Sequence, residues 1–264
     1  MSESAAVLSS AVSKVFASAG SAVQALSAVD FRVDAGEFVS LIGPSGCGKS
    51  TLMRLIADLD VPSTGALSVF GKSAAQARLD QDYGIAFQQA GLLPWRTVEA
   101  NIALPLELHG RSKAERTARV KDLITLVGLT DFAAAYPDQL SGGMQQRVAI
   151  ARSLAAAPRL LLMDEPFGAL DEMTREHMQS ELTRIAAETG AAVVFVTHSI
   201  PEAVFLSDRV VVMSPRPGRI TDDIVIPFAA SRDDGLRESP DFFEKVTEVR
   251  EALHGAPTDR ANER

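Results

Sequence analysis

The sequence has one cysteine, no long hydrophobic run and no excess of positive charge. A single cysteine cannot form a disulfide within the chain, which favours a reducing compartment. The longest apolar stretches, such as AAVVFVT at residues 191–197, are far shorter than the about 20 residues that a membrane-spanning helix needs. The net charge of −8 argues against a general nucleic-acid-binding protein, because such proteins usually carry a basic excess.

Other signals are missing as well. Residues 1–16 lack the charged segment and the apolar core of a secretory signal, and the chain shows no internal repeat or low-complexity linker. The 264 residues, 46% of them hydrophobic and 23% charged, suit one globular domain with room for an inserted subdomain. We expect residues 1–10 and the residues after Gly255 to be frayed.

Short apolar runs alternate with stretches of helical period, which predicts an α/β fold. Strands are expected at residues 37–43, 64–72, 82–89, 159–166, 191–199, 208–214 and 219–227. Helices are expected at 49–59, 112–128, 172–190 and 239–255, with capping residues at several of their ends. Strands followed by helices imply a mainly parallel sheet with right-handed crossovers, and the segment 64–72 adds an antiparallel β portion near the N-terminus.

The stretch from about 90 to 157 is mostly helical and separates two β-rich parts of the chain. We therefore predict one domain over residues 1–230, with a core of residues 10–89 and 158–230 and a helical subdomain of residues 90–157. Residues 231–264 would form a short helical tail. That tail would dock through an apolar helix face made of Phe242, Val246, Val249 and Leu253.

The segment GPSGCGKST is the main candidate for binding phosphate. It matches G-x-x-x-x-G-K-[ST] and lies between an expected strand and an expected helix, the context that this motif requires. Its backbone N–H groups would wrap the phosphates, Lys49 would neutralise the β and γ oxygens, and the Ser50 hydroxyl would ligate Mg²⁺. A glycine-rich turn with a chance lysine is the alternative, which the flanking elements disfavour. The predicted contacts are Gly43, Pro44, Ser45, Gly46, Cys47, Gly48, Lys49, Ser50 and Thr51.

Polar side chains follow three further expected strands, at the edge of the sheet where the phosphate loop would also lie. After RLLLM come Asp164, which would bind Mg²⁺, and Glu165, which would polarise the attacking water; an acidic cap of the strand is the alternative. After VVFVT comes His198, which would donate to the γ-phosphate, although a lone histidine there is more often structural. Gln88 would touch both Mg²⁺ and the water.

A second anion-binding pattern, LSGGMQQR, occupies residues 140–147. A serine and two glycines stand directly before a helix-forming run, and a helix N-terminus attracts anions through its free N–H groups and its dipole. One chain would then have two phosphate sites.

A resemblance explains why one chain would have two phosphate sites. Over residues 10–230 the chain resembles the ATP-binding subunits of ABC transporters, which have the same motifs in the same order: GPSGCGKST, AFQQ, LSGGMQQR, LLLMDEP, GALD and VTHS. The resemblance implies a P-loop NTPase (RecA-like) core with a helical subdomain, and ATPase activity with ATP and Mg²⁺ as cofactors. It also implies a head-to-tail dimer in which Ser141, Gly142 and Gly143 of one chain cover the ATP of a second subunit. Asp171 would run along that interface.

The resemblance further places an aromatic residue against adenine, and Phe16 stands at the matching position; a core residue of a strand is the alternative. Cys47 is a small, tolerated side chain of the phosphate loop and a plausible target for thiol reagents.

The stretch QQAGLLPWRTVEANIALPLEL is similar to importers of nitrate, sulfonates, taurine, bicarbonate and the pyrimidine precursor of thiamine. In that family it forms a groove for a short helix of the membrane permease. Leu92, Leu93 and Trp95 would be an apolar cluster in this groove, or else would pack inside the helical subdomain. The residues after 227 are too few for the C-terminal regulatory domain of some importers.

The implied function is the ATP-hydrolysing subunit of an importer of a small, anionic or heterocyclic nutrient, bound peripherally to the cytoplasmic face of the inner membrane. Its partners would be a second ATP-binding subunit, permease subunits and, indirectly, an extracytoplasmic solute-binding protein, with no nucleic acid. Two alternatives stay open: a soluble ABC ATPase acting on nucleic acid or the ribosome, and an exporter subunit.

Overall fold

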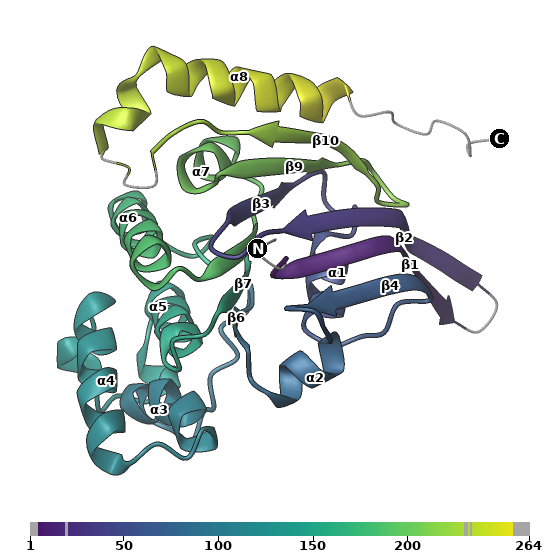
Figure 1. The fold of residues 1–264 in the computed structure, drawn as a ribbon. Helices are drawn as coiled ribbons and strands as arrows, with labels where there is room; N and C mark the ends of the chain where they lie inside the picture. The colour runs from purple at the N-terminus through teal and green to yellow at the C-terminus, as the bar shows by residue number, and fades with distance from the viewer. Residues whose placement is uncertain (1–4, 19–20, 230–231, 233, 256–264) are drawn as a thin grey trace.

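Two β-sheets organise the chain in the computed structural model, which describes residues 5–18, 21–229, 232 and 234–255 (Figure 1). Within these residues the larger sheet has six strands in the order β10-β9-β3-β8-β7-β6. Their bounds are Phe38–Ile42 for β3, Tyr83–Ala86 for β6, Leu160–Asp164 for β7, Ala192–Val196 for β8, Arg209–Met213 for β9 and Ile220–Val225 for β10. All neighbours pair in parallel except β10, which is antiparallel to β9. The predicted mainly parallel sheet is confirmed.

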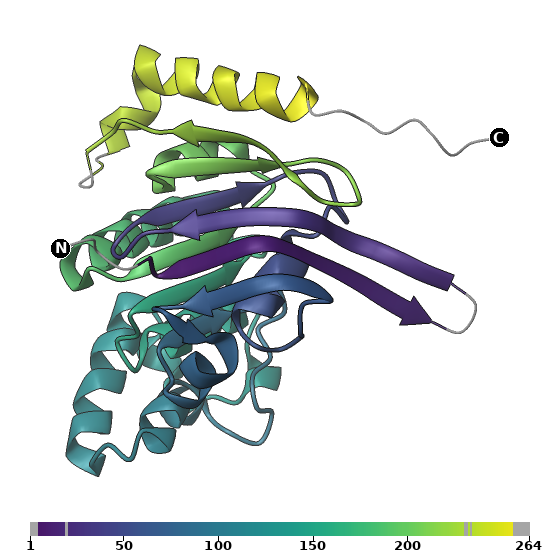
Figure 2. The same ribbon diagram turned by 45° about the vertical axis from the view of Figure 1, so that its right-hand side comes forward.

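The second sheet is antiparallel and has the order β2-β1-β4-β5. The bounds of its strands are Val7–Ser18 for β1, Ser21–Val33 for β2, Thr64–Val69 for β4 and Lys72–Ser73 for β5. Figure 2 shows the β1–β2 hairpin reaching out from the body of the molecule. The predicted antiparallel portion near the N-terminus is therefore confirmed.

The expectation that residues 1–10 are frayed is wrong from Val7 onward. Val7 is buried and lies opposite both Val33 on β2 and Val69 on β4, so a strand on each side fixes this segment. Residues 1–4 and the segment after Gly255 lie outside the described residues.

Helices cover the larger sheet and form a separate group at one end of the molecule (Figure 1). The helices are α1 (Lys49–Ile56), α2 (Ala74–Leu79), α3 (Val98–Leu108), α4 (Lys113–Leu126), α5 (Gly142–Leu154), α6 (Glu172–Thr189), α7 (Ile200–Leu206) and α8 (Pro240–Gly255). Short 3₁₀ turns are η1 (Thr130–Phe132), η2 (Pro137–Gln139) and η3 (Asp234–Glu238). Helices α3, α4 and α5 form the group at the end, in the stretch that the sequence predicted to be helical.

Helix ends follow the capping residues that the sequence suggested. Ser112 and Glu115 form a reciprocal capping box at the start of α4, and Gly190 ends α6 with a φ of 64°. The Ser239 hydroxyl accepts the Phe242 N–H at the start of α8. These local bonds satisfy backbone groups that a helix end otherwise leaves unpaired.

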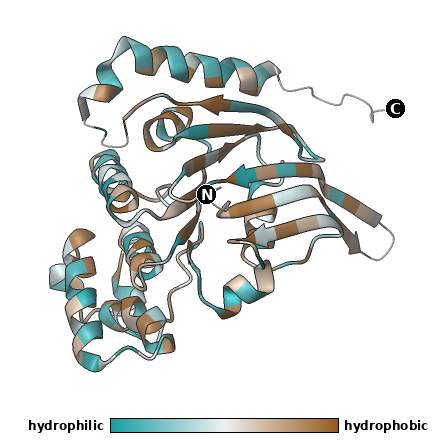
Figure 3. Ribbon diagram, viewed as in Figure 1, coloured by the Kyte–Doolittle hydropathy of each residue, from teal (hydrophilic) through white to brown (hydrophobic). Residues whose placement is uncertain are grey.

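The core lies on both faces of the larger sheet, whose central strands are strongly hydrophobic (Figure 3). In β3, Phe38 and Ile42 face one apolar cluster, whereas Val39 and Leu41 face the other, as the alternation of a strand requires. The first cluster includes the helical group and α8, and the second fills the space between the two sheets around α1. Searched over the described residues, none of the helices has both the length and the apolar character needed to cross a membrane.

Candidate functional site

The phosphate-loop motif occupies the turn between β3 and α1. Gly48 has a φ of 107°, and a Cβ added there would lie 2.6 Å from the Leu26 side chain, so only glycine fits. The Lys49 side chain is buried inside the loop, where its Nζ donates to the carbonyls of Gly43 at 2.8 Å and Pro44 at 3.2 Å. The loop thus holds a cation at the edge of the sheet.

A polar hollow of about 350 Å³ opens over this loop. It is lined by Ser45, Gly46, Gly48, Lys49, Ser50, Thr51, Gln88, Glu165 and His198. Gln88, Glu165 and His198 follow β6, β7 and β8, whose carboxyl ends reach the same edge as the phosphate loop. The structure therefore brings together the residues that the sequence selected from four separate motifs.

Glu165 lines the hollow and has a strained backbone conformation. Its φ is 48°, an uncommon value for a residue other than glycine, and its N–H is fixed by the Val196 carbonyl at 2.8 Å. One carboxylate oxygen accepts from Gln88 Nε2 at 3.1 Å, and the other lies 2.5 Å from His198 Nε2. Two polar groups thus orient the carboxylate toward the space above the phosphate loop.

The neighbouring Asp164 fits a magnesium ligand. Burial raises the pKa of its carboxyl group, against the opposing effect of the Ser50 hydroxyl, which donates to Asp164 Oδ1 at 3.1 Å. A buried carboxylate beside a hydroxyl supplies the hard oxygen donors that Mg²⁺ prefers, and a bound cation would offset the cost of burying the charge. In the part of the chain that the structure describes, no group of three or more His, Cys, Asp or Glu could hold a metal.

The second glycine-rich motif lies apart from this hollow. The Ser141 hydroxyl accepts the Met144 N–H at 3.3 Å and caps α5, while Ser141 and Gly142 are exposed. Gly143 approaches the Ala169 carbonyl, and Asp171 caps α6 by accepting the Thr174 N–H at 3.0 Å. The hydrogen bonds from Thr174 hold the pKa of Asp171 below its usual value. None of the motif's described residues lines the hollow.

The structure bears on the predictions made for Phe16 and for Cys47. The Phe16 side chain is 42% exposed near the end of β1, opposite Val23, so the alternative of a buried core residue is wrong. Stacking on adenine stays a prediction. Cys47 is completely buried within the second apolar cluster, so the expectation that thiol reagents reach it is wrong for this conformation.

Three buried or half-buried polar residues of the helical group position the segment after β6, and sequence reasoning missed them. Gln146 on α5 donates to the Phe87 carbonyl at 2.9 Å, directly before Gln88. Arg152, also on α5, donates to the carbonyls of Ala90 and Gly91 at 2.7 and 2.9 Å. Asn101 on α3 is fully buried and bonds the backbone at four points from Leu93 to Thr97. In the sequence they resemble ordinary polar residues of a helix, and helical period alone gives no signal that distinguishes them.

Comparisons with known proteins agree with these motifs. The family described as ABC transporter matches residues 26–168. The chain is similar to the taurine import ATP-binding protein TauB of Rhizobium johnstonii, at 48% identity over 89% of this chain and 91% of that protein. It is 42% identical to the nitrate import ATP-binding protein NrtD of Synechocystis sp., over 94% of this chain and 95% of that protein. A solved dimeric ATP-binding cassette in a post-hydrolysis state, bound to ADP and Pi, superposes with a TM-score of 0.78 at 35% identity, covering 84% of this chain and 100% of that one.

Proposed function

This chain belongs to the ABC transporter family, and we propose that it is the ATP-hydrolysing subunit of an importer of a small nutrient of the nitrate, sulfonate, taurine or thiamine-precursor type. The observation that carries the proposal is the hollow in which the phosphate loop meets Gln88, Glu165 and His198. The relatives are named for import, so they do not favour the two alternatives of an exporter subunit and a nucleic-acid ATPase.

The residues of the hollow divide the chemistry of hydrolysis among them. Lys49 and the loop N–H groups hold the phosphates, and the Glu165 carboxylate polarises the attacking water. His198 donates to the γ-phosphate. Ser50, Asp164 and Gln88 would hold Mg²⁺, which would supply positive charge to the phosphates.

A second copy of an ATP-binding subunit would complete each site. Ser141 and Gly142 are exposed beside a capped helix N-terminus, so they are free to cover a nucleotide held by another chain. In a two-fold symmetric dimer each phosphate loop would then face the other chain's motif, with Asp171 along the interface. The solved cassette of similar fold is dimeric, which supports this arrangement.

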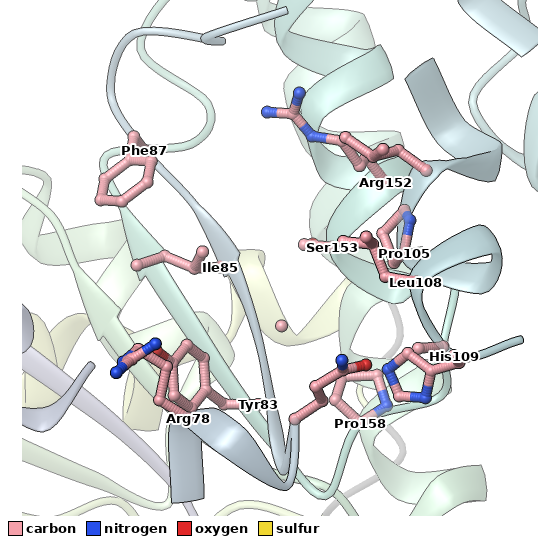
Figure 4. A pocket seen from close by; sticks show the side chains of 14 residues that line it. Arg78, Tyr83, Ile85, Phe87, Pro105, Leu108, His109, Arg152, Ser153 and Pro158 are labelled. Atoms are coloured by element: carbon pink, nitrogen blue, oxygen red, sulfur yellow. The ribbon is translucent and has the colours of Figure 1, made fainter. Parts of the chain in front are cut away.

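The permease would dock in an apolar groove of about 300 Å³ between the edge strand β6 and the helical group. Figure 4 shows Tyr83, Ile85 and Phe87 along one side of this groove, and Pro105 and Leu108 on the other. Arg78 and Arg152 also line it, whereas none of the described lining residues is Asp or Glu. The occupant that fits is a short amphipathic helix that carries an acidic residue. It would touch the residue next to Gln88 and so reach the ATP site.

The predicted apolar cluster is only partly correct, because none of Leu92, Leu93 and Trp95 lines this groove. Leu92 packs against the core of the helical group, and Leu93 is half-buried. Asn101 bonds the N–H and the carbonyl of Leu93 and fixes its backbone. Trp95 is 71% exposed on this fixed loop. A large apolar side chain held in water by a rigid backbone suits an interface, and we keep Trp95 as a permease contact.

The fluorescence of Trp95, the only tryptophan, reports on this contact. We expect emission at long wavelength with ready quenching in the free subunit, and a blue shift when the cognate permease is added in detergent. Trp95→Ala should keep the melting temperature and ATP binding, because the side chain is exposed. It should weaken assembly by about 2 kcal/mol, as an aromatic anchor does.

The matched control is Phe243→Ala, which removes another exposed aromatic side chain from α8, far from the groove. A Trp95→Ala variant that binds the permease as well as the wild type does would remove Trp95 from the interface. The importer function itself is tested by uptake in proteoliposomes that contain the permease and a solute-binding protein outside. Uptake that does not depend on this subunit and ATP, or copurification with nucleic acid instead of a permease, would contradict the proposed function.

A further inference from the structure

A line of polar side chains connects the C-terminal segment with the loop that carries His198. Arg237, in η3, donates to Gln179 Oε1 on α6 at 2.6 Å. The amide nitrogen of Gln179 donates to Glu202 Oε1 on α7 at 2.9 Å. The other oxygen of Glu202 accepts the hydroxyl of Thr197, the residue before His198. Four side chains from separate parts of the chain thus form one continuous series of hydrogen bonds.

The middle of this series is buried. Gln179 is 2%, Thr197 3% and Glu202 7% exposed. Burial raises the pKa of Glu202, while the hydrogen bonds from Thr197 and Gln179 favour its ionised form, and the charges of Arg175 and Arg237 act in the same direction. An isolated carboxylate at this depth would be costly, so each donor in the series matters to the others.

The Thr197 hydroxyl holds the backbone on both sides of His198. It donates to Glu202 and, through the same oxygen, accepts the N–H of Ser199 at 3.0 Å. The imidazole of His198 is 46% exposed, and its Nε2 lies 2.5 Å from a carboxylate oxygen of Glu165. The orientation of this side chain therefore depends on the backbone that Thr197 and Glu202 fix.

We propose that Arg237 is a positioning residue for ATP hydrolysis, which acts through Gln179 and Glu202 to hold His198 against Glu165. This inference rests on the proposed ATPase function. The Arg237 guanidinium lies 3.5 Å from the centre of the buried Phe205 ring, so the group is itself fixed in direction. The C-terminal segment thereby influences turnover without touching the nucleotide, and any partner that displaced η3 would slow hydrolysis.

The test is Arg237→Met in the full chain with Mg-ATP, a change that keeps an unbranched apolar stem over Phe205 and removes the donors. We expect kcat to fall roughly 3- to 30-fold, because a small displacement of a catalytic side chain has effects of this order or larger. The KM for ATP and the Kd of a fluorescent ATP analogue should stay within about twofold, since no nucleotide contact changes.

Gln179→Leu breaks the same series from α6 and guards against a variant that merely loosens the C-terminal segment. We expect the same loss of kcat, and the double variant should lose no more than either single variant, because both remove one connection. Arg250→Met is the matched control on the exposed side of α8 and should behave like the wild type. Rates are measured well below each variant's melting temperature and divided by the folded fraction.

Three results would overturn the inference: an unchanged kcat in Arg237→Met, a loss that disappears after division by the folded fraction, or additive losses in the double variant. A wild-type chain that hydrolyses no ATP would overturn the proposed function and the inference together. An active wild type with an equally active Arg237→Met variant would overturn the inference alone.

Discussion

Replacing Glu165 with glutamine is expected to stop ATP turnover while ATP still binds. The amide keeps the shape of the carboxylate but loses the charge that polarises water, and removal of such a group lowers rates by roughly 10²- to 10⁴-fold. Gln88 and His198 both approach the carboxylate of Glu165, so the glutamine can still accept from one of them and the hollow should keep its form. The contacts with nucleotide that we propose for the phosphate loop should be unaffected.

The same variant should accumulate as a dimer, because ATP that is not hydrolysed continues to join the two chains. Light scattering at micromolar protein with Mg-ATP should give twice the monomer mass, and the monomer mass with ADP. Glu188→Gln is the matched control, since this carboxylate is exposed at the far end of α6. A Glu165→Gln chain that stays monomeric with Mg-ATP, yet binds it, would contradict the shared site.

The sequence predicted the hollow well because each of its parts is specified locally. One strand ends at Asp164, directly before Glu165, and another ends shortly before His198. They need only join one parallel sheet for these side chains to meet. The parallel order of β3, β8 and β7 provides that meeting. Short sequence patterns, together with the rule that parallel strands end at the same edge of a sheet, were therefore sufficient to predict the residues of the hollow.

The β1–β2 hairpin was harder to predict because its pattern is interrupted. Ala11 and Ala28 both have a φ of 48°, and the register between the strands shifts around them. Each bulge moves the following side chains to the other face, which removes the alternation that identifies a strand. The Asp30 carboxylate and the Ser13 hydroxyl accept the N–H groups of Ala11 and Ala28, bonds that become visible only once the strands pair.

The polar connections of Asn101, Arg152 and Arg237 could not be predicted either. In the sequence they are ordinary helix or loop residues, whereas in the structure their partners lie up to 62 positions away. Nothing in helical period distinguishes a solvated arginine from one that bonds a distant part of the chain. Only the packing of the helical group and of the C-terminal segment against the sheet determines which polar side chains become part of the site.

Replacing Lys49 with alanine is expected to weaken nucleotide binding and almost abolish hydrolysis. The ammonium group is held inside the phosphate loop by the Gly43 and Pro44 carbonyls, so it meets the phosphates without further ordering. A charge-assisted hydrogen bond of this kind contributes roughly 1.5–3 kcal/mol, which corresponds to a rise of about ten- to a hundred-fold in Kd.

Calorimetry with ATP measures the loss of affinity in Lys49→Ala, and a phosphate-release assay measures the rate. Because Lys49 is buried, alanine also leaves a gap in the loop, and Lys49→Met separates the two effects by filling that gap without a charge. Both variants should lose affinity and turnover alike, while the exposed control Lys121→Ala changes neither. If Lys49→Met bound ATP as tightly as the wild type, the charge would not hold the phosphates and the lysine's contribution would be one of packing. If either variant hydrolysed ATP at the wild-type rate, the reaction would have to take place outside the hollow above this loop.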